Sequence, residues 1–159
     1  MLPISSQQRT ATSFIDCLFT AVSSTCVTGL IVQDTATYWS AFGQAIILLM
    51  IQIGGMGVIT MGILLSLVSK KRIGLQARST MQEAVSAHSL GGIVRFARFV
   101  IITSIVIEMI GAAVLSTAFC REYGFFKGIW LAFFHSVSAF CNAGFDLMGN
   151  HGKFSSLTY

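Results

Sequence analysis

The sequence predicts an all-α membrane protein with two transmembrane helices and two re-entrant elements, each a short helix followed by a glycine-containing loop. The first observation behind this prediction is composition. Of the 159 residues, 54% are hydrophobic and 10% are charged, which is too little charge to cover a water-soluble domain of this size. The second observation is a pair of long apolar segments, and the third is a short segment that occurs twice.

The repeated segment reads FTAVSSTCVTGL at residues 19–30 and FHSVSAFCNAGF at residues 134–145, so that Phe, Val, Ser, Cys and Gly recur at a constant offset of 115. In each copy, a run that is amphipathic at helical spacing ends in a short stretch closed by one glycine, Gly29 or Gly144. A long apolar segment lies near each copy. We interpret the two copies as an internal duplication.

The first element, residues 13–25, is too short to cross a membrane, because 13 residues form a helix of only ~20 Å against a hydrocarbon core of ~30 Å. A half-length helix is stable at membrane depth only where its unpaired end faces protein or a water-filled cavity. If this helix enters from outside, its carboxyl end lies near the midplane and carries roughly half a negative charge. A cation is therefore the ligand expected at this end of the helix.

Two longer segments are predicted to span the bilayer. Residues 45–68 contain no charge and would form a helix of ~36 Å, and residues 99–119 are interrupted only by Glu108. An ionisable residue at mid-span is a functional candidate. For Glu108 we favour a neutral or hydrogen-bonded side chain packed against a neighbouring element over direct handling of the ion. Gly54, Gly55, Gly57 and Gly62 make one face of the first span small, which permits close helix packing; a gating hinge is the alternative.

The connection between the spans fixes the orientation. It contains a single acid, Glu83, and these basic residues: Lys70, Lys71, Arg72, Arg78, Arg95 and Arg98. By the positive-inside rule this connection is cytoplasmic, which leaves both repeated loops on the extracytoplasmic side. A solvated linker is the simpler interpretation of these charges, and helical spacing in residues 75–88 leaves room for a docking surface.

The loops that follow the short helices are predicted to form an ion-selectivity filter, since glycine accepts the positive φ values that let backbone carbonyls replace a cation's hydration shell. An ordinary turn after a helix is the alternative interpretation of each glycine. The expected filter residues are Cys26, Val27, Thr28 and Gly29 with Cys141, Asn142, Ala143 and Gly144. The carbonyls expected to bind the ion belong to Val27, Thr28, Gly29, Asn142, Ala143 and Gly144.

Other polar residues favour structural roles. Cys26 and Cys141 occupy matching positions and are expected to pack behind the filter, since the four cysteines show no metal-binding spacing. His135 is expected to be a hydrogen-bonding core residue. Asp34 and Asp146 follow the loops, where each carboxylate could concentrate cations or cap a loop. With no nucleophile-base pair or phosphate-binding loop, we expect no enzyme, no cofactor and no nucleic-acid partner.

Five stretches carry a resemblance to a known family: IDCLFTAVSSTCVTGLIVQDT, GQAIILLMIQIGGMGVITMG, the basic connection, IVIEMIG and FFHSVSAFCNAGFDL. Together they resemble the Ktr/Trk/HKT superfamily of potassium transporters, and most of all its bacterial KtrB-type membrane subunits. The resemblance implies four consecutive repeats around one pore, each a membrane helix, a pore loop and a second membrane helix. It also implies a multi-pass protein of the cell membrane, in contact with lipid and with the remaining repeats. A homodimer and a cytoplasmic nucleotide-binding regulatory subunit of the KtrA type are further implied.

This comparison divides the chain into a polar segment, 1–12, a first repeat, 13–68, a cytoplasmic basic linker, 69–95, and a second repeat, 96–159. The first repeat lacks its opening helix and the second its closing helix, so the chain is expected to be a fragment of a potassium-conducting subunit. Within the family a serine at the first-loop glycine goes with sodium permeation, and Gly29 therefore favours potassium. A sodium-coupled or sodium-permeable transporter, and a structural fragment that never assembles a pore, are the alternatives.

Overall fold

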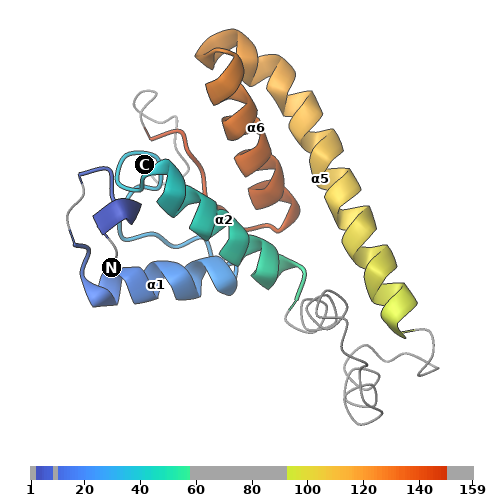
Figure 1. Cartoon of the computed structure of the whole chain (residues 1–159), viewed down its shortest axis with the longest axis horizontal. Helices are drawn as coiled ribbons and strands as arrows, with labels where there is room; N and C mark the ends of the chain where they lie inside the picture. The colour runs from blue at the N-terminus through green and yellow to red at the C-terminus, as the bar shows by residue number, and fades with distance from the viewer. Residues whose placement is uncertain (1–2, 9–10, 58–92, 150–159) are drawn as a thin grey trace. The chain divides into compact units, whose positions relative to one another are not determined.

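The computed structural model describes residues 3–8, 11–57 and 93–149. Over these residues the chain forms helices and no strand, which confirms the predicted all-α class. The helices are η1 (Pro3–Ser5), α1 (Phe14–Thr25), α2 (Ala41–Gly55), α5 (Ile93–Tyr123) and α6 (Phe125–Phe140) (Figure 1). Most of the basic connection between the predicted spans lies outside the described residues, and its predicted cytoplasmic location stays a prediction.

The chain forms two compact units, one of Met1–Gly55 with Ile107–Tyr159 and the other of Met56–Val106. The boundary falls within α5. The first unit contains η1, α1, α2, α6, the carboxyl-terminal part of α5 and both glycine loops. Everything that the sequence predicts to handle an ion therefore belongs to one unit.

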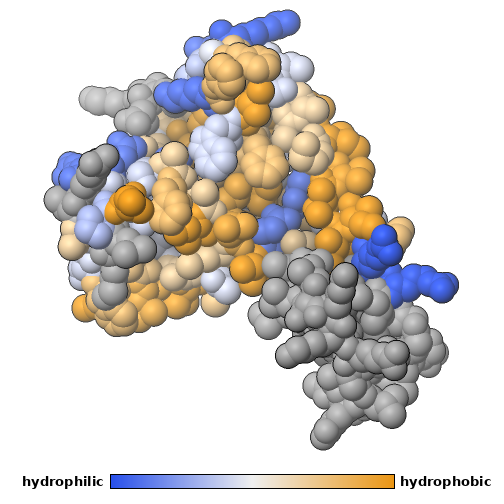
Figure 2. Space-filling view, in the orientation of Figure 1, coloured by the Kyte–Doolittle hydropathy of each residue, from blue (hydrophilic) through white to orange (hydrophobic). Residues whose placement is uncertain are grey.

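Helix α5 matches the second predicted span and extends it at both ends. Its segment Arg98–Tyr123 has a mean hydropathy of 2.3 over its most apolar window, and at 26 residues it would reach ~39 Å, enough to cross a bilayer. Large apolar side chains are exposed along it, among them Phe99, Ile110 and Val114. The space-filling view shows hydrophobic residues over the surfaces of α5 and α1 (Figure 2). Exposed apolar surface of this kind is suited to lipid rather than to water.

The first predicted span differs from the structure. Helix α2 begins at Ala41 instead of residue 45 and ends at Gly55, and Gly57 has a φ of +80°. Consecutive glycines have low helix propensity, and a left-handed glycine shortly after the last turn is a common way to end a helix. Residues 58–68 of the predicted span, Gly62 among them, lie outside the described residues.

The core of the first unit forms where α2 packs between α1 and α6. Phe134 and Phe145 are its largest fully buried side chains, together with Ile51 of α2. A polar link joins the helices as well, because Trp130 Nε1 of α6 donates to Gln44 Oε1 of α2 over 3.0 Å. These contacts hold α6 against α2.

The polar amino-terminal segment packs against the connection that leads into α2. Ser40 N donates to Ser5 O and Gln7 N donates to Tyr38 O, over 2.8 and 2.9 Å. The Gln7 side chain adds a bond from Nε2 to Ala36 O over 2.8 Å. No periodic pattern predicts this packing, since the contacts depend on individual polar groups that meet across about thirty residues of chain.

Candidate ion-binding site

The two short helices end in the same way. Each has its C-cap residue, Cys26 or Cys141, in the right-handed region. Each cap is followed by a non-glycine residue in the left-handed region, Val27 at φ 58° or Asn142 at φ 56°. The offset of 115 therefore holds in the backbone conformation as well as in the sequence.

The N–H group after that left-handed residue turns back onto the helix. Thr28 N donates to Ser23 O over 3.0 Å, and Ala143 N donates to Ser138 O over 2.7 Å. This six-to-one hydrogen bond is the Schellman motif, in which a left-handed residue ends a helix. Because Val27 and Asn142 supply that residue, Gly29 and Gly144 are not part of the turn that ends either helix.

A serine on each helix then closes the loop. Ser23 Oγ donates to Leu30 O over 2.6 Å, and Ser138 Oγ donates to Phe145 O over 2.6 Å. Both serines are almost completely buried. Each loop is thus tied to its own helix at both ends, and the residues between are held in a fixed arc.

The two loops meet at their glycines. Gly29 and Gly144 have φ values of +73° and +71°, and a Cβ added to Gly144 would lie 3.4 Å from Gly29 Cα. A Cβ added to Gly29 would lie 2.7 Å from Ala143 O, closer than Cβ atoms come to such neighbours in real structures. Glycine is required at Gly29 for space as well as for backbone conformation.

The structure thus brings the predicted filter residues of both repeats together. Within the described parts of the chain, no hydrogen bond is made to the carbonyls of Val27, Thr28, Gly29, Asn142, Ala143 and Gly144. The two loops are covered to different extents, since Ala143 is fully buried and its counterpart Thr28 is exposed. Cys26 is also exposed, so the prediction that it packs behind the loop is wrong for this chain. Helix α2 contacts the first repeat one residue earlier, at the backbone of Thr25.

Two glycines of α2 lie against the bases of the two loops. A side chain at Gly54 would run into the backbone of Thr25, the last residue of α1, and one at Gly55 would run into Cys141. The predicted role of these glycines in close packing is confirmed. A side chain at Gly57 would enter open space.

Glu108 is buried, with an exposed fraction of 4%, and is hydrogen-bonded as expected. Gln52 Nε2 of α2 donates to its two carboxyl oxygens over 2.8 and 2.9 Å. Ser136 Oγ of α6 donates to its backbone carbonyl over 2.6 Å. Glu108 therefore links α5 to α2 and to α6 behind the second loop.

The two aspartates that follow the loops have structural partners. Asp34 Oδ1 accepts from the N–H groups of Ala36 and Thr37 over 2.9 and 2.8 Å, which caps the turn after the first loop. Asp146 is 7% exposed and its Oδ1 accepts from Met148 N over 2.8 Å. Of the two roles considered for these carboxylates, the hydrogen bonds favour loop capping.

His135 is a hydrogen-bonding core residue, as expected. Its Nδ1 lies 2.8 Å from Leu131 O, and its Nε2 lies 3.4 Å from Leu147 N, in the segment after the second loop. Within the described parts of the chain, the hydroxyl of the matching Thr20 of α1 makes only the corresponding bond to its own helix, to Asp16 O over 2.8 Å. Over these residues, His135 contacts the segment after its loop and Thr20 does not.

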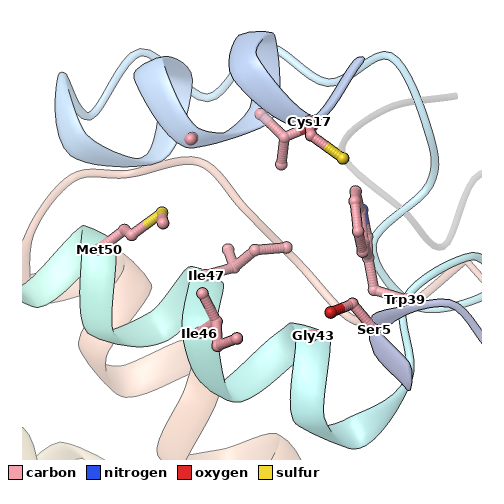
Figure 3. Close-up of a pocket in the computed structure, with 9 residues that line it drawn as sticks. Ser5, Cys17, Trp39, Gly43, Ile46, Ile47 and Met50 are labelled. Carbon is pink, nitrogen blue, oxygen red and sulfur yellow. The ribbon is translucent and has the colours of Figure 1, made fainter. Parts of the chain in front are cut away.

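A hollow of about 280 Å³ occupies the corresponding place in the first repeat, between α1 and α2 (Figure 3). Its lining is mostly apolar and includes Cys17, Thr20 and Ala21 of α1 with Ile46, Ile47 and Met50 of α2. In the second repeat the positions that match Thr20 and Ala21 contact α5, since the ring of His135 lies 5.4 Å from that of Phe119 and Ser136 bonds to Glu108. The hollow thus lies beside two residues of α1 whose counterparts in α6 contact α5.

Comparison with known proteins identifies the family. A model of the TrkH family, described as cation transport protein, matches residues 2–154. The chain belongs to the TrkH family. Family membership and the apolar, exposed helix α5 together place this TrkH-family chain in a membrane.

Curated relatives support the assignment. The chain is 43% identical over 149 residues to the potassium/sodium uptake protein NtpJ of Enterococcus hirae, a match that covers 94% of this chain and 33% of the relative. It is 44% identical over 147 residues to the Ktr system potassium uptake protein B of Bacillus subtilis, covering 92% and 33%. The protein of that name from Vibrio alginolyticus is 35% identical over 138 residues, covering 87% and 30%. This TrkH-family chain spans about a third of the length of these relatives.

Proposed function

We propose that this chain forms part of the pore of a potassium uptake protein, to which it contributes two re-entrant loops of a four-repeat assembly. One observation carries the proposal: loops 26–30 and 141–145 share one backbone conformation and meet at Gly29 and Gly144. A selectivity filter needs repeated loops of one shape around a common axis. Two loops of this chain already have that relationship.

The backbone carbonyls of the loops bind the ion. Positive φ values at the second and fourth residues of each loop, and not at the residue between them, let successive peptide planes turn their oxygens toward one side. The carbonyls involved make no other hydrogen bond within the described residues. Each loop also follows directly on the carboxyl end of a helix, α1 or α6, where the macrodipole favours a cation.

Both helices are of the length that a re-entrant element requires. Helix α1 has 12 residues and α6 has 16, so that they reach only ~18 and ~24 Å into a hydrocarbon core of ~30 Å. Their last carbonyls then come to lie within the membrane, where the loops and the ion pathway supply polar surroundings. The protein crosses the cell membrane several times, with the loops opening to the outside.

Potassium is the favoured ion. The relatives include potassium uptake proteins and one potassium/sodium uptake protein. Gly29 favours potassium over sodium in view of the family pattern, and permeation by sodium is the alternative. A chain that packs as a structural element without forming a pore is the second alternative.

The remaining repeats of the transporter complete the site. A membrane helix from outside the described residues covers the hollow beside Thr20 and Ala21, as α5 covers the matching face of α6. In keeping with the family, two copies of the whole transporter associate, and a cytoplasmic nucleotide-binding subunit regulates them.

A chimaera tests the proposal. Residues of this chain replace the matching third of the Bacillus subtilis Ktr system potassium uptake protein B, and the product is expressed in a strain without potassium uptake. Restored growth at low potassium, with uptake of potassium faster than of sodium, is the expected result. Equal uptake of both ions would favour the sodium-permeable alternative, and correct membrane insertion without any uptake would favour the structural one.

A further inference from the structure

One face of α2 supports the base of the second loop. Gln52 and Gly55 are three residues apart and lie on the same side of the helix. Gly55 leaves no room for a side chain next to Cys141, the first residue of that loop. Gln52 Oε1 lies 4.0 Å from Cys141 Sγ, a long contact within the range of a weak thiol hydrogen bond.

The other end of the Gln52 amide is anchored. Its Nε2 donates to the two carboxyl oxygens of Glu108 over 2.8 and 2.9 Å. Glu108 is held to α6 in turn, since Ser136 Oγ donates to its backbone carbonyl and Gly111 makes room for Ser136 one turn further along α5. One glutamine side chain thus links the buried carboxyl group of α5 to the cysteine that begins the loop.

Among the residues that the structure describes, the first loop has no such support. Its matching residue, Cys26, is exposed, and the contact that α2 makes there is with the backbone of Thr25 through Gly54. Within these residues the support is therefore specific to the second repeat. Sequence alone does not pair these residues, because Gln52 and Glu108 lie 56 positions apart.

We propose that Gln52 is a positioning residue for ion discrimination: anchored by Glu108, it fixes the base of loop 141–145 and so the spacing of the carbonyls of Asn142, Ala143 and Gly144. Gln52 does not contact the ion. The inference rests on the proposed function, in which those carbonyls bind potassium. A filter distinguishes ions through the number and placement of its carbonyls, so a loop that is free to shift discriminates less.

The chimaera described above provides the test. Gln52→Leu removes both polar contacts and should lower the ratio of potassium to sodium uptake by roughly tenfold, the effect expected when a hydrogen bond to an ionisable group is lost. The matched control is Gln44→Leu, a glutamine of the same helix that also bonds to α6 but lies away from the loops. Its ratio should stay unchanged even if the amount of folded protein falls.

A reciprocal exchange of the Gln52 and Glu108 side chains distinguishes the loss of their hydrogen bonds from a change in side-chain size. Gln52→Glu and Glu108→Gln should each lower the ratio, and the double variant, which restores an amide opposite a carboxyl group, should recover it to within about twofold. In a chimaera that selects potassium, an unchanged ratio in Gln52→Leu, or an equal loss in Gln44→Leu, would overturn the positioning role while the proposed function stands.

An inactive chimaera would contradict the proposed function rather than the positioning role of Gln52. In that case a measurement on the 159-residue chain tests the positioning role. The chain in lipid nanodiscs is treated with a small alkylating reagent, and the rate at each cysteine is followed by peptide mass spectrometry. Gln52→Leu should speed the alkylation of Cys141 by roughly tenfold and leave exposed Cys26, the internal reference, unchanged. Unchanged alkylation of Cys141 would overturn the positioning role.

Discussion

The carbonyl oxygen of Ala143 lies where a side chain on Gly29 would begin, 2.7 Å from the position of its Cβ. The reverse contact is looser, since a Cβ on Gly144 would meet only Gly29 Cα, at 3.4 Å. The two loops therefore touch without being equivalent. One of them presents a carbonyl to its neighbour, and the other presents a glycine that makes room for it.

This asymmetry predicts different outcomes for the two glycines. Gly29→Ala and Gly144→Ala both place a side chain at positive φ, at a cost of ~1–2 kcal/mol each. Only Gly29→Ala also displaces the Ala143 carbonyl, and it should abolish potassium uptake by the chimaera, whereas Gly144→Ala should retain a measurable part. Initial uptake rates at equal membrane abundance provide the measurement. Loss of uptake in Gly144→Ala with retention in Gly29→Ala would contradict the predicted asymmetry between the two loops.

A second prediction concerns the left-handed residues that end the short helices. Val27 is β-branched and strained at φ 58°, whereas Asn142 is a residue that tolerates this region. Val27→Asn should therefore stabilise the chain by ~1 kcal/mol, and Asn142→Val should destabilise it by ~1 kcal/mol or more. Thermal unfolding of the purified chain in detergent measures both. Effects of the opposite signs would show that the backbone of these residues is not in the left-handed region.

The buried serines lead to a third prediction. Ser23→Ala and Ser138→Ala each leave a loop carbonyl without its 2.6 Å hydrogen bond and should destabilise the chain by ~1–3 kcal/mol. Ser116→Ala is the matched control, since Ser116 is only half-buried on α5 and its hydroxyl, among the described residues, bonds only to its own helix. Its effect should stay within ~0.5 kcal/mol. Equal effects in all three variants would argue against loop closure by the serines.

The glycines of α2 and α5 differ in what a side chain would meet. At Gly54 it would meet the backbone of Thr25, which cannot move alone, whereas at Gly111 it would meet only the hydroxyl of Ser136, which can rotate away. Gly54→Ala should thus destabilise the chain by ~3 kcal/mol or more and Gly111→Ala by about half as much. Unfolding in denaturant compares the two. A larger effect at Gly111 would place α2 further from α1 than the structure has it.

Much of the site could be predicted from the sequence because the duplication is exact in register. The helix expected at residues 13–25 is observed as Phe14–Thr25, and the offset of 115 relates the φ values and hydrogen bonds of the two loops. The left-handed conformation of Val27 could have been inferred only from Asn142, the matching residue of the second copy. Asn142 after a helical run is a known helix-ending residue, and the offset transfers that role.

Tertiary contacts account for what the sequence did not predict. Residues 45–68 read as one apolar span because hydropathy does not register the break that Gly55 and Gly57 introduce. The exposure of Cys26 was unexpected, since matching positions in a duplication need not have matching neighbours. The link between Gln52 and Glu108 joins two helices far apart in sequence, and no local pattern encodes it.

Gly29→Ser is the sharpest test of whether these loops discriminate between cations through their backbone. Potassium and sodium uptake by the chimaera are measured for the parent, for Gly29→Ser and for the control Ser116→Ala. The preference for potassium over sodium should narrow in Gly29→Ser alone, with each 1.4 kcal/mol lost from the difference in binding free energy lowering it about tenfold. An unchanged preference in Gly29→Ser would show that this loop is not the filter.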